Sequence, residues 1–328
     1  LMDRRGYKAG ILVGLCLYAL GALLFVPAAG INSFAMFLFA LFVIACGLGC
    51  LETAANPYAT VLGSPEGAER RLNMAQSFNG LGQFIGPMIG GTLFFSATQS
   101  SGDQSSVKIT YVAIAVLVLA IAFLFRRTPL PDIREAEEGV SEGAAQGLWQ
   151  HRHFSFGVVT QFFYVAAQVG VGAFFINYAT EHWHGVSNQH AAWMLSVAMI
   201  SFMVGRFFST WLMGRVQAAT LLMLYALVNI VLCGVVMLSI DAVSVVALIA
   251  IFFFMSIMFP TIFALGVKNM GSHTKRASSF MIMAIVGGAV MPYFMGAIAD
   301  HHSTAMAYGL PLVCFIVVLF YGMSQRRR

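Results

Sequence analysis

The feature that most constrains the fold of this sequence is a series of long apolar blocks separated by short polar breaks. Each block approaches the roughly 20 residues that a helix needs to cross the apolar core of a bilayer. Ten such blocks are present, at residues 9–27, 35–62, 73–96, 108–125, 155–180, 189–213, 217–239, 243–267, 277–299 and 304–323. Stretches such as 114–123 show no alternation of apolar and polar residues, so the sequence predicts helices and an all-α polytopic membrane protein.

The composition excludes two other classes of protein. Of the 328 residues, 59% are hydrophobic and 9% are charged, whereas soluble domains carry about 25% charged residues. The net charge is +5, but the basic residues are scattered between the apolar blocks and form no single patch, which excludes a nucleic-acid-binding protein. The five cysteines lie within apolar blocks and are interpreted as reduced packing residues.

The distribution of lysine and arginine predicts the orientation in the membrane. If the ten blocks are helices, Lys108 falls on one side and the other 17 of the 18 basic residues fall on the opposite side. The positive-inside rule makes the basic side cytoplasmic, so the charged loops and the C-terminus are expected there. The polar stretch 126–153 is predicted to be a cytoplasmic linker between a helical half at 1–125 and a second half at 154–328.

The two halves contain an internal repeat with a period of 203 to 205 residues. Residues 57–63 correspond to 260–266, and residues 1–4 correspond more weakly, at an interval of 211 residues, to 212–215. Parallel repeats of this kind are related by an axis along the membrane normal. Because two apolar blocks precede Leu212 and none precedes Leu1, we expect ten helices of a set of twelve, with the first half lacking its first two.

Several motifs resemble those of one transporter family. Residues 3–8, Asp-Arg-Arg-Gly-Tyr-Lys, resemble the loop motif of the major facilitator superfamily. Residues 47–57, Gly-Leu-Gly-Cys-Leu-Glu-Thr-Ala-Ala-Asn-Pro, and 71–79, Arg-Leu-Asn-Met-Ala-Gln-Ser-Phe-Asn, are similar to the L-fucose:proton symporters and their glucose/galactose-transporting relatives. The similarity continues at residues 161–168, 260–263, 266–271 and 278–280.

The resemblance implies a major facilitator fold and a function. It implies a multi-pass protein of the bacterial inner membrane that takes up a sugar together with a proton by alternating access. The sugar would be a hexose or a 6-deoxyhexose such as fucose, galactose or glucose. The expected partners are therefore the sugar, protons and the lipid bilayer, with no cofactor, no nucleotide and no nucleic acid.

Glu52 is the predicted proton-coupling residue. It is the only one of the 13 acidic residues that lies deep within an apolar block. An ionised carboxylate is costly at that depth, so taking up a proton is the cheapest way to neutralise it. A group that is neutral where water is excluded and ionised where water reaches it can couple proton movement to a cavity that opens to each side of the membrane in turn. The alternative is a structural carboxylate paired with a neighbouring helix.

Polar side chains form stripes on three of the predicted helices. The helical period places Glu52 and Asn56 on one face, and Gln76 and Asn79 on one face of the next block. Amide side chains both donate and accept hydrogen bonds, as sugar hydroxyls require. The alternative is hydrogen bonding between helices, but the family resemblance favours Gln76 and Asn79 as sugar contacts. The complete set of predicted sugar contacts is Asn56, Gln76, Asn79, Gln161, Tyr164 and Gln168.

Four charged residues near the cytoplasmic loops form a predicted conformational latch. Asp3 is expected to act with Arg4, and Arg206 with Arg215, to hold these loops in one conformation. The alternative is that these charges only set the topology.

The remaining motifs exclude other classes of activity. The histidines of the external loops lack a helical i, i+4 pair or a carboxylate scaffold, so no metal site is predicted. No nucleophile–base pair at membrane depth and no phosphate-cradling motif is present, which argues against an enzyme and against a nucleotide-driven pump. A sodium-coupled or uncoupled sugar carrier and a non-transporting sugar sensor of the same fold remain the alternatives.

Overall fold

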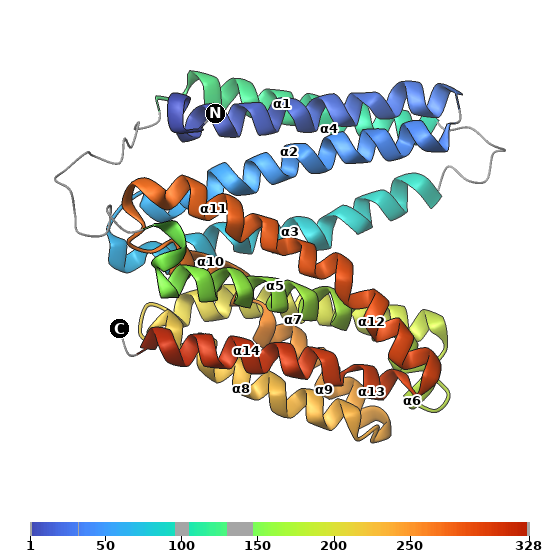
Figure 1. Ribbon diagram of the computed structural model, residues 1–328. Coiled ribbons are helices and arrows are strands. Elements are labelled where there is room, and N and C mark those ends of the chain that lie inside the picture. Colours follow the sequence, from blue (N-terminus) through green and yellow to red (C-terminus); the bar gives the residue numbers. More distant parts are fainter. Residues whose placement is uncertain (1, 32, 96–104, 130–146, 327–328) are drawn as a thin grey trace. The chain divides into compact units, whose positions relative to one another are not determined.

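The structure is a computed structural model that describes residues 2–31, 33–95, 105–129 and 147–326, and throughout these ranges the chain is mainly helical, without strands (Figure 1). The side chains of residues 2–5, 83, 84, 86–95, 105 and 106 are outside the description. The α-helices are α1 (Met2–Ile31), α2 (Phe34–Val61), α3 (Ala68–Phe95), α4 (Ser105–Arg127), α5 (Arg152–Ala173), α6 (Phe175–His182), α7 (Asn188–Leu212), α8 (Ala218–Met237), α9 (Asp241–Met255), α10 (Met258–Val267), α11 (Thr274–Met283), α12 (Gly287–His301), α13 (Thr304–Ala307) and α14 (Gly309–Arg326). Short 3₁₀ turns at Pro65–Gly67, Leu148–Gln150, Gly271–His273 and Ala284–Val286 complete the order.

Nine stretches of the described chain are long and apolar enough to cross a membrane. They are Gly6–Ile31, Phe34–Val61, Val107–Arg127, Arg152–Ala173, Asn188–Leu212, Ala218–Met237, Asp241–Val267, Gly271–His301 and Thr304–Arg326. They confirm nine of the ten predicted blocks and the all-α membrane fold. The tenth block forms α3, whose arginine, asparagine and glutamine side chains make it less apolar than the others.

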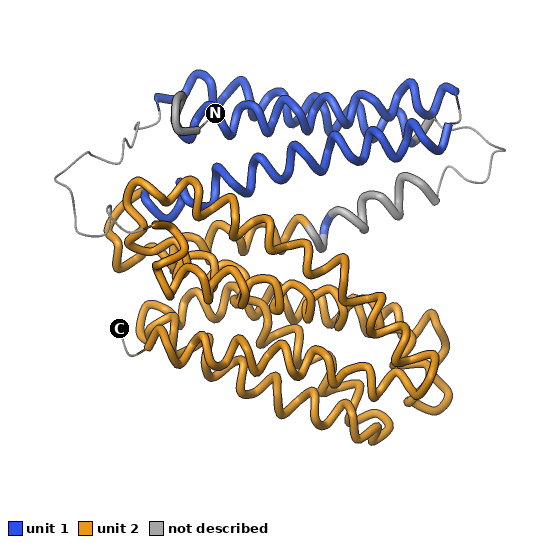
Figure 2. The backbone as a smooth tube through the Cα atoms, viewed as in Figure 1, with its two compact units in different colours: residues 1–61, 85–141 blue, residues 62–84, 142–328 orange. Residues whose placement is uncertain are grey.

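The chain is divided into two compact units (Figure 2). The first unit contains residues 1–61 and 85–141, and the second contains residues 62–84 and 142–328. Part of the linker, residues 130–146, lies outside the described residues. The boundaries 1–125, 126–153 and 154–328 that the sequence indicates therefore stay a prediction.

The first unit is built on the packing of α1 against α2 and α4. Gly47 of α2 allows the close approach, because a Cβ atom there would lie 2.6 Å from the backbone nitrogen of Tyr18 on α1. The rings of Phe25 and Tyr111 stack at 3.6 Å and join α1 to α4. The close approach at Gly47 packs α2, the helix that carries Glu52, against α1.

The second unit is organised around α5, which packs against α10, α12 and α14. Tyrosine hydroxyls tie its helices together: Tyr164 donates to the carbonyl of Met255 at 2.8 Å, and Tyr308 donates to that of Val171 at 3.3 Å. Both tyrosines are fully buried, so the two hydrogen bonds satisfy hydroxyls that would otherwise be costly in the core.

Three of the membrane-spanning stretches, at residues 241–267, 271–301 and 304–326, are interrupted helices. The predicted block 155–180 is also interrupted, because α5 ends at Ala173 and α6 begins after Phe174. The stretch 241–267 is similarly divided between α9 and α10, close to Pro260. Proline has no N–H to donate, so the carbonyl of Ser256, four residues earlier, lacks its helical donor. This free carbonyl becomes important in the candidate site.

Candidate functional site

The carboxylate of Glu52 lies in the interior of α2 and is hydrogen bonded one turn along the same helix. The side-chain Nδ2 of Asn56 donates to Glu52 Oε2. Glu52 is half-buried and Asn56 is 5% exposed. The next polar residue, Thr60, is buried and donates its hydroxyl to the carbonyl of Pro57 at 2.7 Å. The shared face of Glu52 and Asn56 is confirmed, and the pair combines one titratable group with one fixed donor.

The predicted amide pair of α3 is also formed. Asn79 Nδ2 donates to Gln76 Oε1 at 3.2 Å, across one helical turn. Gln76 is 7% exposed, whereas Asn79 is exposed. Gln83, the next residue of this stripe, lies among the side chains outside the description. The exposed amide of Asn79 is therefore held in place by the buried amide of Gln76. Such a pair can form hydrogen bonds with a polyhydroxylated ligand.

Arg206 forms a buried cross-link between helices of the second unit. The residue lies within α7 and is 3% exposed. Its Nε donates to the freed carbonyl of Ser256 at 2.8 Å, and its Nη1 donates to the backbone carbonyl of Gln76. The guanidinium also lies 4.6 Å from the ring of Phe202. A single side chain thus connects α3, α7 and the break between α9 and α10.

The other latch residues lie in different surroundings. Arg215 is exposed, with its guanidinium 4.5 Å from the ring of Trp211. The side chains of Asp3 and Arg4 lie outside the described residues. A latch formed by these residues stays a prediction.

The stripe on α5 divides into three different environments. Tyr164 is fully buried, and its hydroxyl is already used by the carbonyl of Met255. Gln168 is half-buried. Gln161 is 0% exposed, and neither its amide nitrogen nor its amide oxygen has a hydrogen-bond partner among the described residues. Leaving a buried polar group unpaired costs about 1–3 kcal/mol, so Gln161 is the side chain of this stripe that a polar ligand would satisfy best.

Sequence reasoning missed two polar contacts near the start of α3. Asn73 donates to the hydroxyl of Thr261 on α10 at 3.1 Å, and Glu69 pairs with Lys268 at 2.9 Å. Glu69 and Lys268 lie next to loops, where charged residues are common, so the sequence did not suggest that they form an ion pair. The polar face of α3 could have been recognised, because residues 69, 73 and 76 follow the 4- and 3-residue spacing of one helical face.

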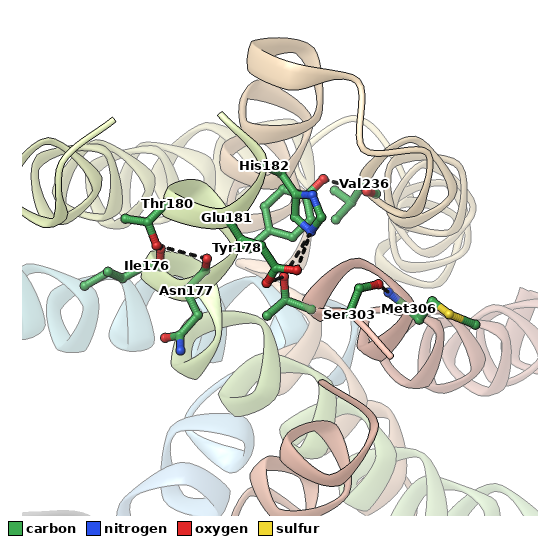
Figure 3. Close-up of polar contacts among 10 residues, drawn as sticks. Ile176, Asn177, Tyr178, Thr180, Glu181, His182, Val236, Ser303 and Met306 are labelled. Atoms are coloured by element: carbon green, nitrogen blue, oxygen red, sulfur yellow. Dashed lines mark hydrogen bonds and ion pairs between the residues drawn. The ribbon is translucent and has the colours of Figure 1, made fainter. Parts of the chain in front are cut away.

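A polar cluster joins the end of α6 to the start of α13 (Figure 3). The Thr304 hydroxyl donates to Glu181 Oε2 at 2.6 Å, and His182 Nε2 lies 3.1 Å from the same hydroxyl. His182 also lies 3.4 Å from Glu181 Oε1 and packs against the ring of Tyr178. The threonine hydroxyl, the acid and the imidazole are therefore in mutual contact. The described residues contain no group of three or more His, Cys, Asp or Glu side chains that could hold a metal ion.

Comparisons with known proteins give consistent results. The family model described as Major Facilitator Superfamily matches residues 1–285. The chain is 37% identical over 327 residues to the glucose/galactose transporter of Brucella abortus biovar 1 (strain 9-941), covering 98% of this chain and 79% of that protein. It is 39% identical over 346 residues to the L-fucose-proton symporter of Escherichia coli K12, with the same coverage.

The structure is similar to that of a sugar symporter. It matches a crystal structure of the transporter FucP in the outward conformation with a TM-score of 0.91 and 37% sequence identity. The match covers 99% of this chain and 84% of the FucP chain.

Proposed function

The chain belongs to the major facilitator superfamily, as its motifs predicted, and on this basis we propose that it is a sugar:proton symporter of the bacterial inner membrane that works by alternating access. The substrate class is a hexose or a 6-deoxyhexose. Similarity to an L-fucose-proton symporter and to glucose/galactose transporters over nearly the whole chain supports this class. The observation in the structure that carries the proposal is the hydrogen-bonded pair of Glu52 and Asn56 inside a membrane-spanning helix.

Glu52 is proposed to carry the coupled proton. Its carboxylate accepts a hydrogen bond from the Asn56 amide, and the same oxygen can accept that bond when the other oxygen is protonated. Asn56 can therefore hold Glu52 in one position in both protonation states. The ionised form is favoured where water reaches the carboxylate, and the neutral form is favoured where water is excluded. One proton that crosses 100 mV provides about 2.3 kcal/mol, which drives the accumulation of a neutral sugar.

The amides of the second unit are proposed to bind the sugar. Gln76 and Asn79 offer an exposed amide backed by a buried one, and Gln161 offers a buried amide whose donor and acceptor find no partner in the described part of the chain. Neutral amides provide both kinds of hydrogen bond without the cost of a buried charge. Gln168 is a further proposed contact. For Tyr164, whose hydroxyl is used within the fold, the proposed contribution is the face of its ring.

The experiment that tests this function is uptake into proteoliposomes. Labelled fucose, galactose, glucose and mannose are supplied with an imposed proton gradient, and the assay is repeated with a protonophore. We expect one or more of these sugars to accumulate only while the gradient exists. Accumulation that survives the protonophore and requires sodium would indicate a sodium symporter. Sugar binding without counterflow would indicate a sensor.

The orientation in the membrane is a separate part of the proposal. If the ten blocks alternate in direction, 17 of the 18 lysines and arginines fall on one side, and the positive-inside rule assigns that side to the cytoplasm. A cysteine introduced at exposed Arg276 should then resist a membrane-impermeant thiol reagent in intact cells, whereas one at exposed His302 should react.

A further inference from the structure

The second unit contains a cavity of about 500 Å³ where several of its helices end. Its walls come from the start of α3, the loop 213–217, the first turn of α8, the last turn of α10 and the end of α14. Six titratable side chains line it: Glu66, Glu69, Arg70, Arg215, Lys268 and Arg326. None of them belongs to the proposed sugar site, although Arg215 was one of the predicted latch residues.

The charges of this cavity do not balance. Lys268 and Glu69 neutralise each other through a 2.9 Å ion pair. This leaves three arginines, Arg70, Arg215 and Arg326, against Glu66, so three positive charges minus one negative charge give an excess of two. In the described part of the chain, none of the three arginines forms an ion pair.

Arg70 and Arg215 both lie at the loop 213–217. A Cβ atom added at Gly214 would lie 3.4 Å from Nη1 of Arg70, so this guanidinium packs over the residue next to Arg215. Arg215 places the face of its guanidinium against Trp211, which leaves the N–H edges available. Like charges that line one cavity repel each other, and an anion bound among them relieves this repulsion. Arginine is also the side chain whose planar set of donors best fits phosphate oxygens.

We propose that this cavity is a binding site for a phosphate group, carried either by a soluble phosphate compound or by a phospholipid head group. The start of α8 adds to the cationic walls, because Ala218 and Ala219 line the cavity and the N-cap residue Gln217 makes no side-chain cap bond. A basic pocket at the ends of transmembrane helices has the chemistry that binds anionic head groups.

Binding of phosphate would affect transport, a consequence that rests on the proposed function. A phosphate held by Arg70 of α3 and by Arg215 and Arg326 would stabilise the arrangement in which these helix ends are together. The internal repeat assigns α3 to the first half of the chain and the other walls to the second half. Alternating access separates such ends in one of its two states, so bound phosphate slows transport without contacting the sugar.

The test measures binding alone, so that it does not depend on sugar transport. Inorganic phosphate is titrated into the purified full chain in uncharged detergent, against chloride at equal ionic strength, and thermal unfolding is followed. Phosphate should raise the unfolding midpoint because it binds the folded state. The double variant Arg70→Gln, Arg326→Gln should need at least about tenfold more phosphate for the same effect. Arg276→Gln, a matched exposed arginine outside the cavity, should respond like the wild type.

A second variant and a lipid arm complete the test. Glu66→Gln removes the unpaired acid, so it should bind phosphate more tightly even if the arginine variant folds poorly. The same proteins are compared in nanodiscs of phosphatidylcholine with and without phosphatidylglycerol. A response to inorganic phosphate identifies a soluble ligand, and a response to phosphatidylglycerol alone identifies a lipid. The proposal is overturned if neither probe stabilises the wild type, or if the arginine double variant and Glu66→Gln both respond as the wild type does.

Discussion

Arg206 Nη1 donates a hydrogen bond to the backbone carbonyl of Gln76, so a guanidinium on α7 holds the turn of α3 that presents a proposed sugar contact. The second hydrogen bond of Arg206 depends on a proline. Because Pro260 cannot donate to Ser256, the Ser256 carbonyl is free to accept from Arg206 Nε at 2.8 Å. The position of Gln76 therefore depends on residues of two other helices.

Replacing this guanidinium should weaken both the fold and sugar binding. Arg206→Lys keeps the positive charge but cannot donate from two fixed directions, so at least one buried carbonyl loses its partner. We expect a loss of about 1–3 kcal/mol in the free energy of unfolding, together with weaker sugar binding. Chemical denaturation and calorimetry measure the two effects. The matched control is Arg276→Lys at an exposed arginine, and equal stabilities of the two variants would contradict the cross-link.

The amide pair of α3 should contribute directly to sugar affinity. Gln76→Ala and Asn79→Ala are each expected to weaken binding by about 1–3 kcal/mol, because sugar hydroxyls lose a partner. The two residues share a hydrogen bond, so the effects of the single variants should not add in the double variant. Calorimetry on the three purified variants measures this. Unchanged affinity in both single variants would mean that the pair serves only helix association.

Gln161 allows the binding role to be separated from a structural role. Gln161→Leu keeps the approximate size of the side chain and removes a buried amide that has no partner among the described residues. Stability should stay the same or rise, because an unsatisfied polar group is lost, while sugar affinity falls. A variant that binds sugar as tightly as the wild type would exclude Gln161 from the site. Gln168→Leu at the half-buried position gives the comparison on the same helix.

The cluster at the start of α13 should stabilise the second unit. Thr304→Val keeps the shape of the side chain but removes the hydroxyl that contacts both Glu181 and His182. We expect a loss of about 1–3 kcal/mol in unfolding free energy, since hydrogen bonds to charged groups are the stronger ones. Thermal unfolding measures it, with Ser303→Ala as the neighbouring control, whose effect should be smaller. Equal stability of Thr304→Val and the wild type would show that the contact is not stabilising.

Much of the fold could be predicted from hydrophobic patterns alone. The apolar blocks are long enough that their length and charge content identify the spans, and nine of them are present in the described structure. The helical period placed Glu52 with Asn56, and Gln76 with Asn79, because residues three and four positions apart always share a face. These are local properties of a helix, and they do not depend on its neighbours.

The remaining contacts depend on which helices are neighbours, and periodicity carries no such information. The contacts of Arg206 were not predicted, because its partners are backbone carbonyls of distant residues. The face of α5 that carries Gln161 and Tyr164 was evident, but their different environments were not, since Tyr164 finds a carbonyl on α9 and Gln161 finds none among the described residues. The Ser256 carbonyl that Pro260 leaves free accepts from Arg206, which lies 54 residues before Pro260 in the sequence.

If Glu52 carries the proton that moves with the sugar, sugar-induced proton uptake must depend on this residue. Sugar is added to proteoliposomes in weakly buffered medium, and the external pH is recorded for the wild type, Glu52→Gln and the exposed control Asp300→Asn. We expect alkalinisation with the wild type and the control. For Glu52→Gln we expect no pH change and no accumulation, while sugar binding and counterflow persist. Alkalinisation by Glu52→Gln at the wild-type rate would show that Glu52 does not carry the coupled proton.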